Sequence, residues 1–287
     1  MSSRAAAVTE RIRMITVTIV GSGGATPYQA RTTAMLVVDA AGARALIDCG
    51  SGASHRIAEA GIAASSIDAL FFTHFHADHC IDFPVFVMTS YLAGRRAPLR
   101  IYGPSGVGRF VDLMLKELFP YISKLVSALT EVPFEVIVEE LAPEAEVVLE
   151  GLHVKAGAAK HSVPSLCYRF DTATESVAVS GDTEATSTVV ALAKDCRLLI
   201  HECPFPVHMG RIPDHTQASE VGVIANEACA GAVLLTHLFE EVVGHEQEMI
   251  EAVRAAFAGQ IVIAEDLMTL TVDGPNIVVG GVGEPTR

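Results

Sequence analysis

The segment His74-Phe75-His76-Ala77-Asp78-His79 places three imidazoles and one carboxylate within six consecutive positions. The apolar run 69–73 before it predicts a buried strand, so the string begins where that strand ends. Because alternate side chains of an extended segment point the same way, His74 and His76 can reach one metal ion. Asp78 and His79, beyond the bend, can reach a second ion. Imidazole and carboxylate ligands without a thiolate favour Zn²⁺, with Mn²⁺ or Fe²⁺ as substitutes.

Further candidate ligands follow predicted strands later in the chain, at His161, Asp182 and His237. Strand ends are where a rigid sheet presents functional side chains. Taken singly, each of these residues also fits a capping or core position. Together with the string, they make up a set that is large enough to hold two metal ions. We therefore expect a dinuclear metal site built from His74, His76, Asp78, His79, His161, Asp182 and His237.

The rest of the chain alternates short β-branched runs with helical periodicity in both halves. Strands are expected at residues 15–20, 33–38, 45–48, 69–73, 152–159, 167–170, 177–180, 198–201, 232–235 and 261–264. Helices are expected at 53–60, 84–93, 107–129 with a break at Pro120, 185–193, 217–230 and 245–257. Strands with flanking helices in both halves favour an α/β fold with two sheets packed face to face, an αββα sandwich. We expect an N-terminal tail at 1–13 and one domain at 14–287.

The string His-x-His-x-Asp-His, followed by single His, Asp and His positions, resembles the metallo-β-lactamase superfamily. It is most similar to the branch of ribonuclease Z and its arylsulfatase-like and phosphodiesterase-like relatives. The similarity extends to residues 21–27, 46–50, 201–203 and 214–216, with 264–268 as its weakest part. It implies the metallo-β-lactamase fold, with Asp182 bridging two metal ions. One ion would be bound by His74, His76 and His161, and the other by Asp78, His79 and His237.

Hydrolysis is the chemistry expected of such a site. Two metal ions lower the pKa of a shared water and hold the resulting hydroxide as a nucleophile. Asp78 would orient that water or take its proton, and His215, just before the helix expected at 217–230, would stabilise or protonate the leaving oxygen. Glu202 would orient His215, because both match paired positions of the ribonuclease Z pattern. A helix-capping role is the alternative for His215, and Asp48 would either orient a ligand imidazole or serve a turn.

Composition limits the partners and the compartment. The 20 Lys and Arg against 34 Asp and Glu give a formal net charge of −14, which argues against general nucleic-acid binding. No window approaches the roughly 18 apolar residues of a membrane span, and no secretory apolar region follows the N-terminus. The six cysteines form no Cys-x-x-Cys pair and are expected to be reduced, mostly buried thiols. We therefore expect a soluble, cytoplasmic protein.

Departures from the ribonuclease Z pattern favour a small-molecule ester as substrate. Only 21 positions separate His161 from Asp182, which leaves no room for the long basic arm that relatives acting on transfer RNA commonly carry. Asp82-Phe83-Pro84 stands where that branch usually has Gly-Leu-Pro, and is expected to add a charge and a ring close to the metals. The expected function is hydrolysis of a small phosphodiester or related ester. Alternatives are a sulfate ester or lactone, then transfer-RNA 3′ processing, then metal binding without turnover.

Other features of the sequence are assigned structural roles. The motif Gly21-x-Gly23-x-x-Thr26 lacks the third glycine of a dinucleotide fingerprint, so no nucleotide cofactor is expected. Segment 107–129 fits core, a homodimer face or a substrate lid. Solvated or capping roles are expected for the histidines without ligand-like neighbours in the sequence, namely His55, His153, His208 and His245.

Overall fold

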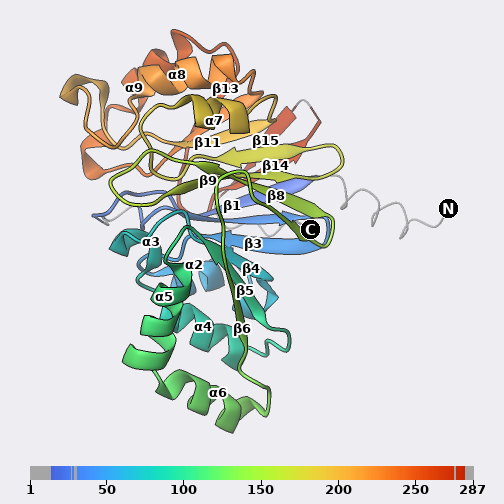
Figure 1. Cartoon of the computed structure of the whole chain (residues 1–287). Helices are drawn as coiled ribbons and strands as arrows, with labels where there is room; N and C mark the ends of the chain where they lie inside the picture. The colour runs from blue at the N-terminus through green and yellow to red at the C-terminus, as the bar shows by residue number, and fades with distance from the viewer. Residues whose placement is uncertain (1–13, 27, 29–30, 275, 282–287) are drawn as a thin grey trace, which may run out of the picture.

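The computed structural model describes residues 14–26, 28, 31–274 and 276–281. Its strands form two packed sheets, and helices cover the outer face of each sheet (Figure 1). The expected αββα sandwich is therefore confirmed. The expected tail at 1–13 and the last residues, 282–287, lie outside the described part, so the domain limits 14–287 stay a prediction.

The first sheet has eight strands. The pairs from β15 through β14, β1 and β2 to β3 are antiparallel, whereas those from β3 through β4 and β5 to β6 are parallel. In spatial order they are β15 (Asn276–Gly280), β14 (Thr269–Asp273), β1 (Ile15–Gly21), β2 (Met35–Ala40), β3 (Ala43–Ile47), β4 (Ala69–Phe71), β5 (Leu99–Gly103) and β6 (Val136–Glu140).

The second sheet has seven strands and repeats this division. Strands β7 to β10 are antiparallel, and β10 to β13 are parallel. In spatial order they are β13 (Gln260–Ile263), β12 (Ala232–Thr236), β11 (Leu198–Glu202), β10 (Ser176–Val179), β9 (Leu166–Asp171), β8 (Leu152–Ala158) and β7 (Glu146–Leu149). The inner faces of both sheets share one apolar core that includes Ile47, Phe71 and Tyr168.

Two helical layers bury the outer faces. A second apolar cluster joins the first sheet to helices that include α4 and α6, and a third joins the second sheet to α7, α8 and α9. The helices and helical turns on the side of the first sheet are α2 (Ala53–Glu59), η1 (Ala64–Ser66), α3 (Ala77–Cys80), α4 (Phe83–Leu92), α5 (Val107–Asp112), the π-helical η2 (Leu113–Leu118) and α6 (Tyr121–Thr130). Those of the second half are α7 (Ser187–Leu192), η3 (Val207–Met209), α8 (Ala218–Glu227), η4 (Glu240–Val242) and α9 (Glu246–Arg254).

The predicted elements are present, with strand ends shifted by up to two residues, and segment 107–129 breaks at Pro120 as expected. Five strands were not predicted, namely β5, β6, β7, β14 and β15. Three of these, β6, β7 and β15, lie at sheet edges. At least half of the side chains of β6 and β7 face solvent, which interrupts the apolar run that predicts a strand. Among the described residues no helix is long and apolar enough to cross a membrane. All six cysteines are free thiols, and only Cys229 is exposed, as expected.

The carboxylate of Asp266, just before β14, is hydrogen-bonded to residues that follow β1. Its Oδ1 accepts hydrogen bonds from the backbone N and Oγ of Ser22, at 2.8 and 2.7 Å. Its Oδ2 accepts from the N and Oγ1 of Thr32, both at 2.7 Å, and from Arg56 at 2.8 Å. This residue lies in the weakest part of the family resemblance, yet it holds Ser22 and Thr32, two residues between β1 and β2. Its side chain is buried, so these donors depend on it.

We predict that Asp266→Ala lowers the free energy of unfolding by about 3 kcal/mol, because it leaves buried donors and part of a buried ion pair without a partner. Asp273→Ala, at the exposed end of β14, is the control and should change it by less than about 0.5 kcal/mol. Urea unfolding of the two variants measures both values. Equal midpoints for the two variants would contradict the role given to Asp266.

Candidate metal centre

Side chains from both sheets meet at one rim of the sandwich. His74 lies just beyond β4 of the first sheet, whereas His161, Asp182 and His237 follow β8, β10 and β12 of the second. In sheets of this kind, ligands bind beyond the carboxyl ends of the strands. Loops that are far apart in sequence therefore present their side chains to a common space.

The short helix α3 brings Asp78 and His79 to this rim, and the turn after β3 holds it there. Cys49 N donates to the carbonyl oxygen of His79 at 2.7 Å. A Cβ atom on Gly50 would lie 1.8 Å from the carbonyl oxygen of Asp78, so only glycine allows this approach. The carboxylate of Asp48 lies 2.8 Å from His79 Nδ1, which leaves Nε2 of that ring facing the other candidate ligands. Of the two expected roles of Asp48, this contact supports the orienting one.

Segment 107–129 packs against the histidine string through Phe110. The ring of Phe75, between His74 and His76, stacks on Phe110 of α5 at 4.9 Å between centroids. Phe110 also contacts Phe72. Other side chains of the segment, such as Leu129, are exposed, so a homodimer face and a substrate lid both stay predictions for it.

The structure brings all seven candidate ligands together. His74, His76 and His161 form one group and Asp78, His79 and His237 another, each with ligand atoms within 4.8 Å of one another. Asp182 lies between the two groups. Its Oδ2 is 3.9 Å from the Nε2 atoms of His74 and His161, 3.5 Å from that of His79 and 3.3 Å from that of His237.

The chemistry of these residues fits divalent metal ions. Nε2 of His74 is buried and has no hydrogen-bond partner among the described residues, a state that costs about 1–3 kcal/mol unless a ligand satisfies the atom. Burial and the neighbouring His79 lower the pKa of His74 to about 2, so its ring is neutral, as metal binding requires. Burial acts to raise the pKa of Asp182, but His237 and His79 hold it well below its usual range. An ionised carboxylate that faces four imidazole nitrogens attracts a cation.

The charge state of His79 points the same way. Burial acts to lower its pKa, but the carboxylates of Asp182 and Asp48 raise it well above its usual range. Positive charge is therefore favoured at this position, and a metal ion would supply it in place of the proton. For Asp78, burial acts to raise the pKa, but hydrogen bonds from His237 and His79 bring it below its usual range.

His215 and Glu202 form a pair beside these groups. His215 Nδ1 lies 2.8 Å from Glu202 Oε2, and Glu202 Oε1 accepts from Thr183 N at 2.8 Å. Burial and the nearby Asp182 raise the pKa of Glu202 above its usual range. The ring of His215 lies 5.8 Å from that of His237, so its Nε2 is the nitrogen left for the site.

The helix-capping alternative for His215 is wrong. Helix α8 begins at Ala218 with Gln217 as its N-cap, and Gln217 N donates to Glu220 at 3.0 Å. His215 therefore lies just before the helix, as expected, but is not its cap. It also forms a third donor group with Asp182 and His237, so metal ligation is a role that sequence reasoning did not consider.

Asp82 and Phe83, expected close to the metals, make other contacts, and Asp82 belongs to no donor group found among the described residues. Helix α4 begins at Phe83 and turns both side chains toward the helical layer. Asp82 accepts a hydrogen bond from Ser54 N at 2.7 Å, at the start of α2. Phe83 is fully buried against Phe72. This departure from the family pattern therefore says nothing about the substrate.

Two of the histidines expected to be solvated or capping also lie in a donor group. His208 and His245 come together with Glu248, with ligand atoms within 4.8 Å of one another. The spacing of His245 and Glu248 at the start of a helix could have indicated this pair, because residues three apart share a helix face. Nothing in the sequence links His208 to them.

The αββα sandwich with this rim of imidazoles and carboxylates defines a metal-dependent hydrolase of the metallo-β-lactamase fold. The metallo-β-lactamase fold protein YhfI from Bacillus subtilis aligns with a TM-score of 0.77 at 23% identity, over 90% of this chain and 100% of that one. The chain belongs to the family described as Anti-Pycsar protein Apyc1, whose sequence model matches residues 15–258.

Curated relatives agree with the expected branch. Ribonuclease Z of Methanosarcina acetivorans is 27% identical over 311 residues, which cover 90% of this chain and 98% of that protein. Ribonuclease Z of Mycobacterium sp. (strain KMS) is 29% identical over 286 residues, covering 94% and 100%. The structure of human tRNase Z, short form, aligns with a TM-score of 0.69 at 25% identity, over 88% of this chain and 98% of that one. The resemblance to the ribonuclease Z branch is therefore confirmed.

We predict that Asp182→Ala loses the metal of both groups, because its Oδ2 faces four imidazoles across them. His55→Ala, which removes an exposed histidine of α2, should keep it. Elemental analysis after loading with Zn²⁺ and dialysis against metal-free buffer measures the content, and circular dichroism checks the fold. Equal metal content in the two folded variants would show that the ligand assignment is wrong.

Proposed function

We propose that the chain is a dinuclear metal-dependent hydrolase acting on a small phosphodiester or a related ester. The observation that carries this proposal is the pair of donor groups with one carboxylate, Asp182, between them. Five imidazoles and two carboxylates suit two Zn²⁺ ions, and Mn²⁺ or Fe²⁺ could replace them. When bound, two such ions lower the pKa of a shared water toward neutrality and polarise the ester oxygen.

The chain's own residues have separate tasks in this reaction. Asp78 is ionised and would orient the attacking water or take its proton. His215, held through Nδ1 by Glu202, would direct Nε2 at the leaving oxygen and donate a proton to it. The buried Glu202 touches the substrate only through His215 and acts as a positioning residue.

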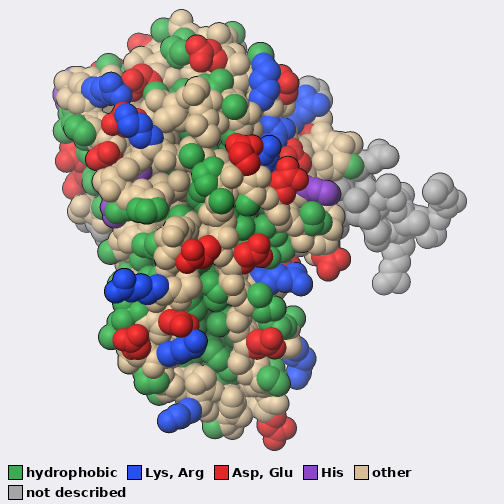
Figure 2. Space-filling view, in the orientation of Figure 1, with side chains coloured by type: hydrophobic (Ala, Val, Ile, Leu, Met, Phe, Trp, Pro, Cys, Tyr) green, Lys and Arg blue, Asp and Glu red, His purple; other side chains and the backbone are tan. Residues whose placement is uncertain are grey.

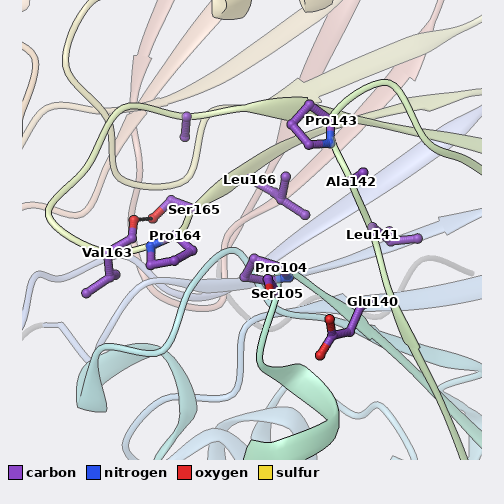
Figure 3. A pocket seen from close by; sticks show the side chains of 11 residues that line it. Pro104, Ser105, Glu140, Leu141, Ala142, Pro143, Val163, Pro164, Ser165 and Leu166 are labelled. Carbon is purple, nitrogen blue, oxygen red and sulfur yellow. Dashed lines mark hydrogen bonds between the residues drawn. The ribbon is translucent and has the colours of Figure 1, made fainter.

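A recess beside the loop of His161 would take the organic part of the substrate. It has a volume of about 570 Å³, within the range of small-ligand sites. Figure 3 shows Val163 and Pro164 on one side of it, facing Pro104 from the end of β5. Ala159 and Val163, which flank His161 by two residues each, both line it. Its largely apolar walls favour an ester with an apolar or aromatic group.

Charged groups at the same loop favour an anionic ester. Lys160 lies 2.6 Å from the carboxylate of Glu184, and Arg211 lies 3.2 Å from it. Arg211 also lies 4.0 Å from the carboxylate of Glu220. Both cations lie beside His161, whose Nδ1 is 2.9 Å from the carbonyl oxygen of Asp214. The side chains of Lys160 and Arg211 are 66% and 57% exposed, so their charges can also reach an anionic ester. This suits a phosphodiester or sulfate ester better than a neutral lactone.

Transfer RNA is a less suitable substrate, although relatives are named ribonuclease Z. The chain between His161 and Asp182 consists of the β9–β10 hairpin and short loops, with no separate arm. Over the described residues visible in Figure 2, Lys and Arg side chains are interspersed with Asp and Glu and form no continuous basic patch. With a net charge of −14, this surface would repel an RNA backbone.

We predict that zinc- or manganese-loaded protein hydrolyses bis(p-nitrophenyl) phosphate faster than p-nitrophenyl sulfate or a simple lactone, because of the anion-favouring edge and the paired metal groups. A chelator should abolish the reaction. Precursor transfer RNA should stay uncut at physiological salt, because there is no separate arm between His161 and Asp182 and the net charge is −14. Initial rates and gel analysis test this order. Efficient 3′ trimming, or faster turnover of the lactone, would overturn the proposal.

We predict that His215→Ala slows hydrolysis of an alkyl phosphodiester by about two to three orders of magnitude, as loss of a general acid does. The loss should shrink with a p-nitrophenyl leaving group, which needs little protonation. His153→Ala, an exposed change on β8, is the control. Rates and metal content are measured together. A His215→Ala protein that has lost metal would identify this residue as a ligand instead of an acid.

A further inference from the structure

The loops that leave β11 and β12 run side by side away from the metal centre. Their strands are parallel neighbours, with Glu202 opposite Thr236. Beyond the strands, Phe239 N donates to the carbonyl oxygen of Pro204 at 3.1 Å. The rings of Phe205 and Phe239 stack at 4.8 Å between centroids. The first loop continues into η3 and then to His215, and the second continues through η4 to α9.

Three possible ligands, His208, His245 and Glu248, come together farther along these two loops. The rings of His208 on η3 and His245 before α9 are 4.6 Å apart between centroids. His245 Nδ1 lies 3.1 Å from Glu248 Oε2. Ligands about 2.1 Å from a tetrahedral Zn²⁺ ion lie about 3.4 Å from each other, so this pair already has nearly the required separation. The third nitrogen is within 4.8 Å, a distance that a small side-chain rotation can shorten.

The surroundings favour a cation and leave it accessible. Residues 240–251 contain five glutamates and no lysine or arginine. The side chains of His245 and Glu248 are 42% and 41% exposed, so an ion can enter from solvent. His245 occupies the N-cap position of α9, yet its side chain makes no capping hydrogen bond within the described residues. Its imidazole is therefore not committed to holding the helix end.

We propose that His208, His245 and Glu248 form a third metal site, separate from the seven ligands at the sheet rim. Two imidazoles and one carboxylate are a donor set that binds Zn²⁺ with one position left for water. The ion ties η3 to the start of α9. Because η3 belongs to the loop that carries His215, the ion restrains the loop on which the proposed acid sits.

A salt bridge between His245 and Glu248 without metal is the competing explanation. Such a pair needs only two residues of one helix, and His55 and Glu59 form one on α2 at 3.3 Å with no third ligand among the described residues. A metal site differs because it also requires His208 from another loop. Changes at His208 therefore separate the two explanations.

The first test counts zinc ions at equilibrium with a fixed concentration of free Zn²⁺. The wild type should bind one more ion per chain than each of the variants His208→Ala, His245→Ala and Glu248→Gln. His55→Ala, the matched histidine of a metal-free pair, should bind as many ions as the wild type. Because His208 is exposed on a short helical turn, its removal leaves the fold intact, which circular dichroism checks. Equal zinc counts in all five proteins would overturn the proposal.

The second test measures the restraint on the loop. Arg211 follows η3 and its side chain is 57% exposed, so trypsin can cut after it when the loop opens. Zinc at about ten times the dissociation constant of the site should slow this cut by about tenfold in the wild type. It should have no such effect in His208→Ala, although that protein keeps the metals of the sheet rim. The same protection in both proteins would show that zinc acts elsewhere.

Discussion

The buried carboxylate of Asp182 sets the main constraint on this molecule. It lies within 3.9 Å of four imidazole nitrogens that come from both sheets. A buried charge is tolerated only when it is paired. The strand ends of the two sheets must therefore lie close enough for their imidazoles to face this carboxylate. The sandwich meets the requirement because each sheet turns its parallel strands toward the same rim. The candidate site thus belongs to the packing of the sheets and not to any one loop.

Other buried carboxylates hold the loops around this centre. Asp48 accepts hydrogen bonds from the N and Oγ1 of Thr73, at 2.7 and 2.8 Å, and lies 2.8 Å from His79 Nδ1. Glu202 links Thr183 to His215, and Asp266 links Ser22 to Thr32. In each case the two oxygens of one carboxylate contact residues from segments that are distant in sequence. The result is a rim in which irregular backbone is fixed by side-chain acceptors.

The sequence predicts the parts of this arrangement that are local. The string from His74 to His79 shows its ligand spacing directly, and most central strands show β-branched runs. His161, Asp182 and His237 could be assigned only together with that string, because a lone polar residue after a strand is ambiguous. The contacts of Asp82 and Phe83 could not be predicted, because packing at the start of α4 decides them. The link between His208 and Glu248 could not be predicted, because it arises only when neighbouring strands bring two loops together.

The same topology places the proposed acid, His215, and the proposed ligand His208 at different positions of one loop. The chain leaves β11 at Glu202, passes η3 and returns with His215 to the centre, so both ends of this excursion touch the rim. Its outer part, at η3, contacts the segment before α9 through the rings of His208 and His245. Fixing the outer part costs the least at a point where both loops already touch, because the contact has been ordered by folding. A ligand bound there can tune the position of His215 without replacing any residue of the rim.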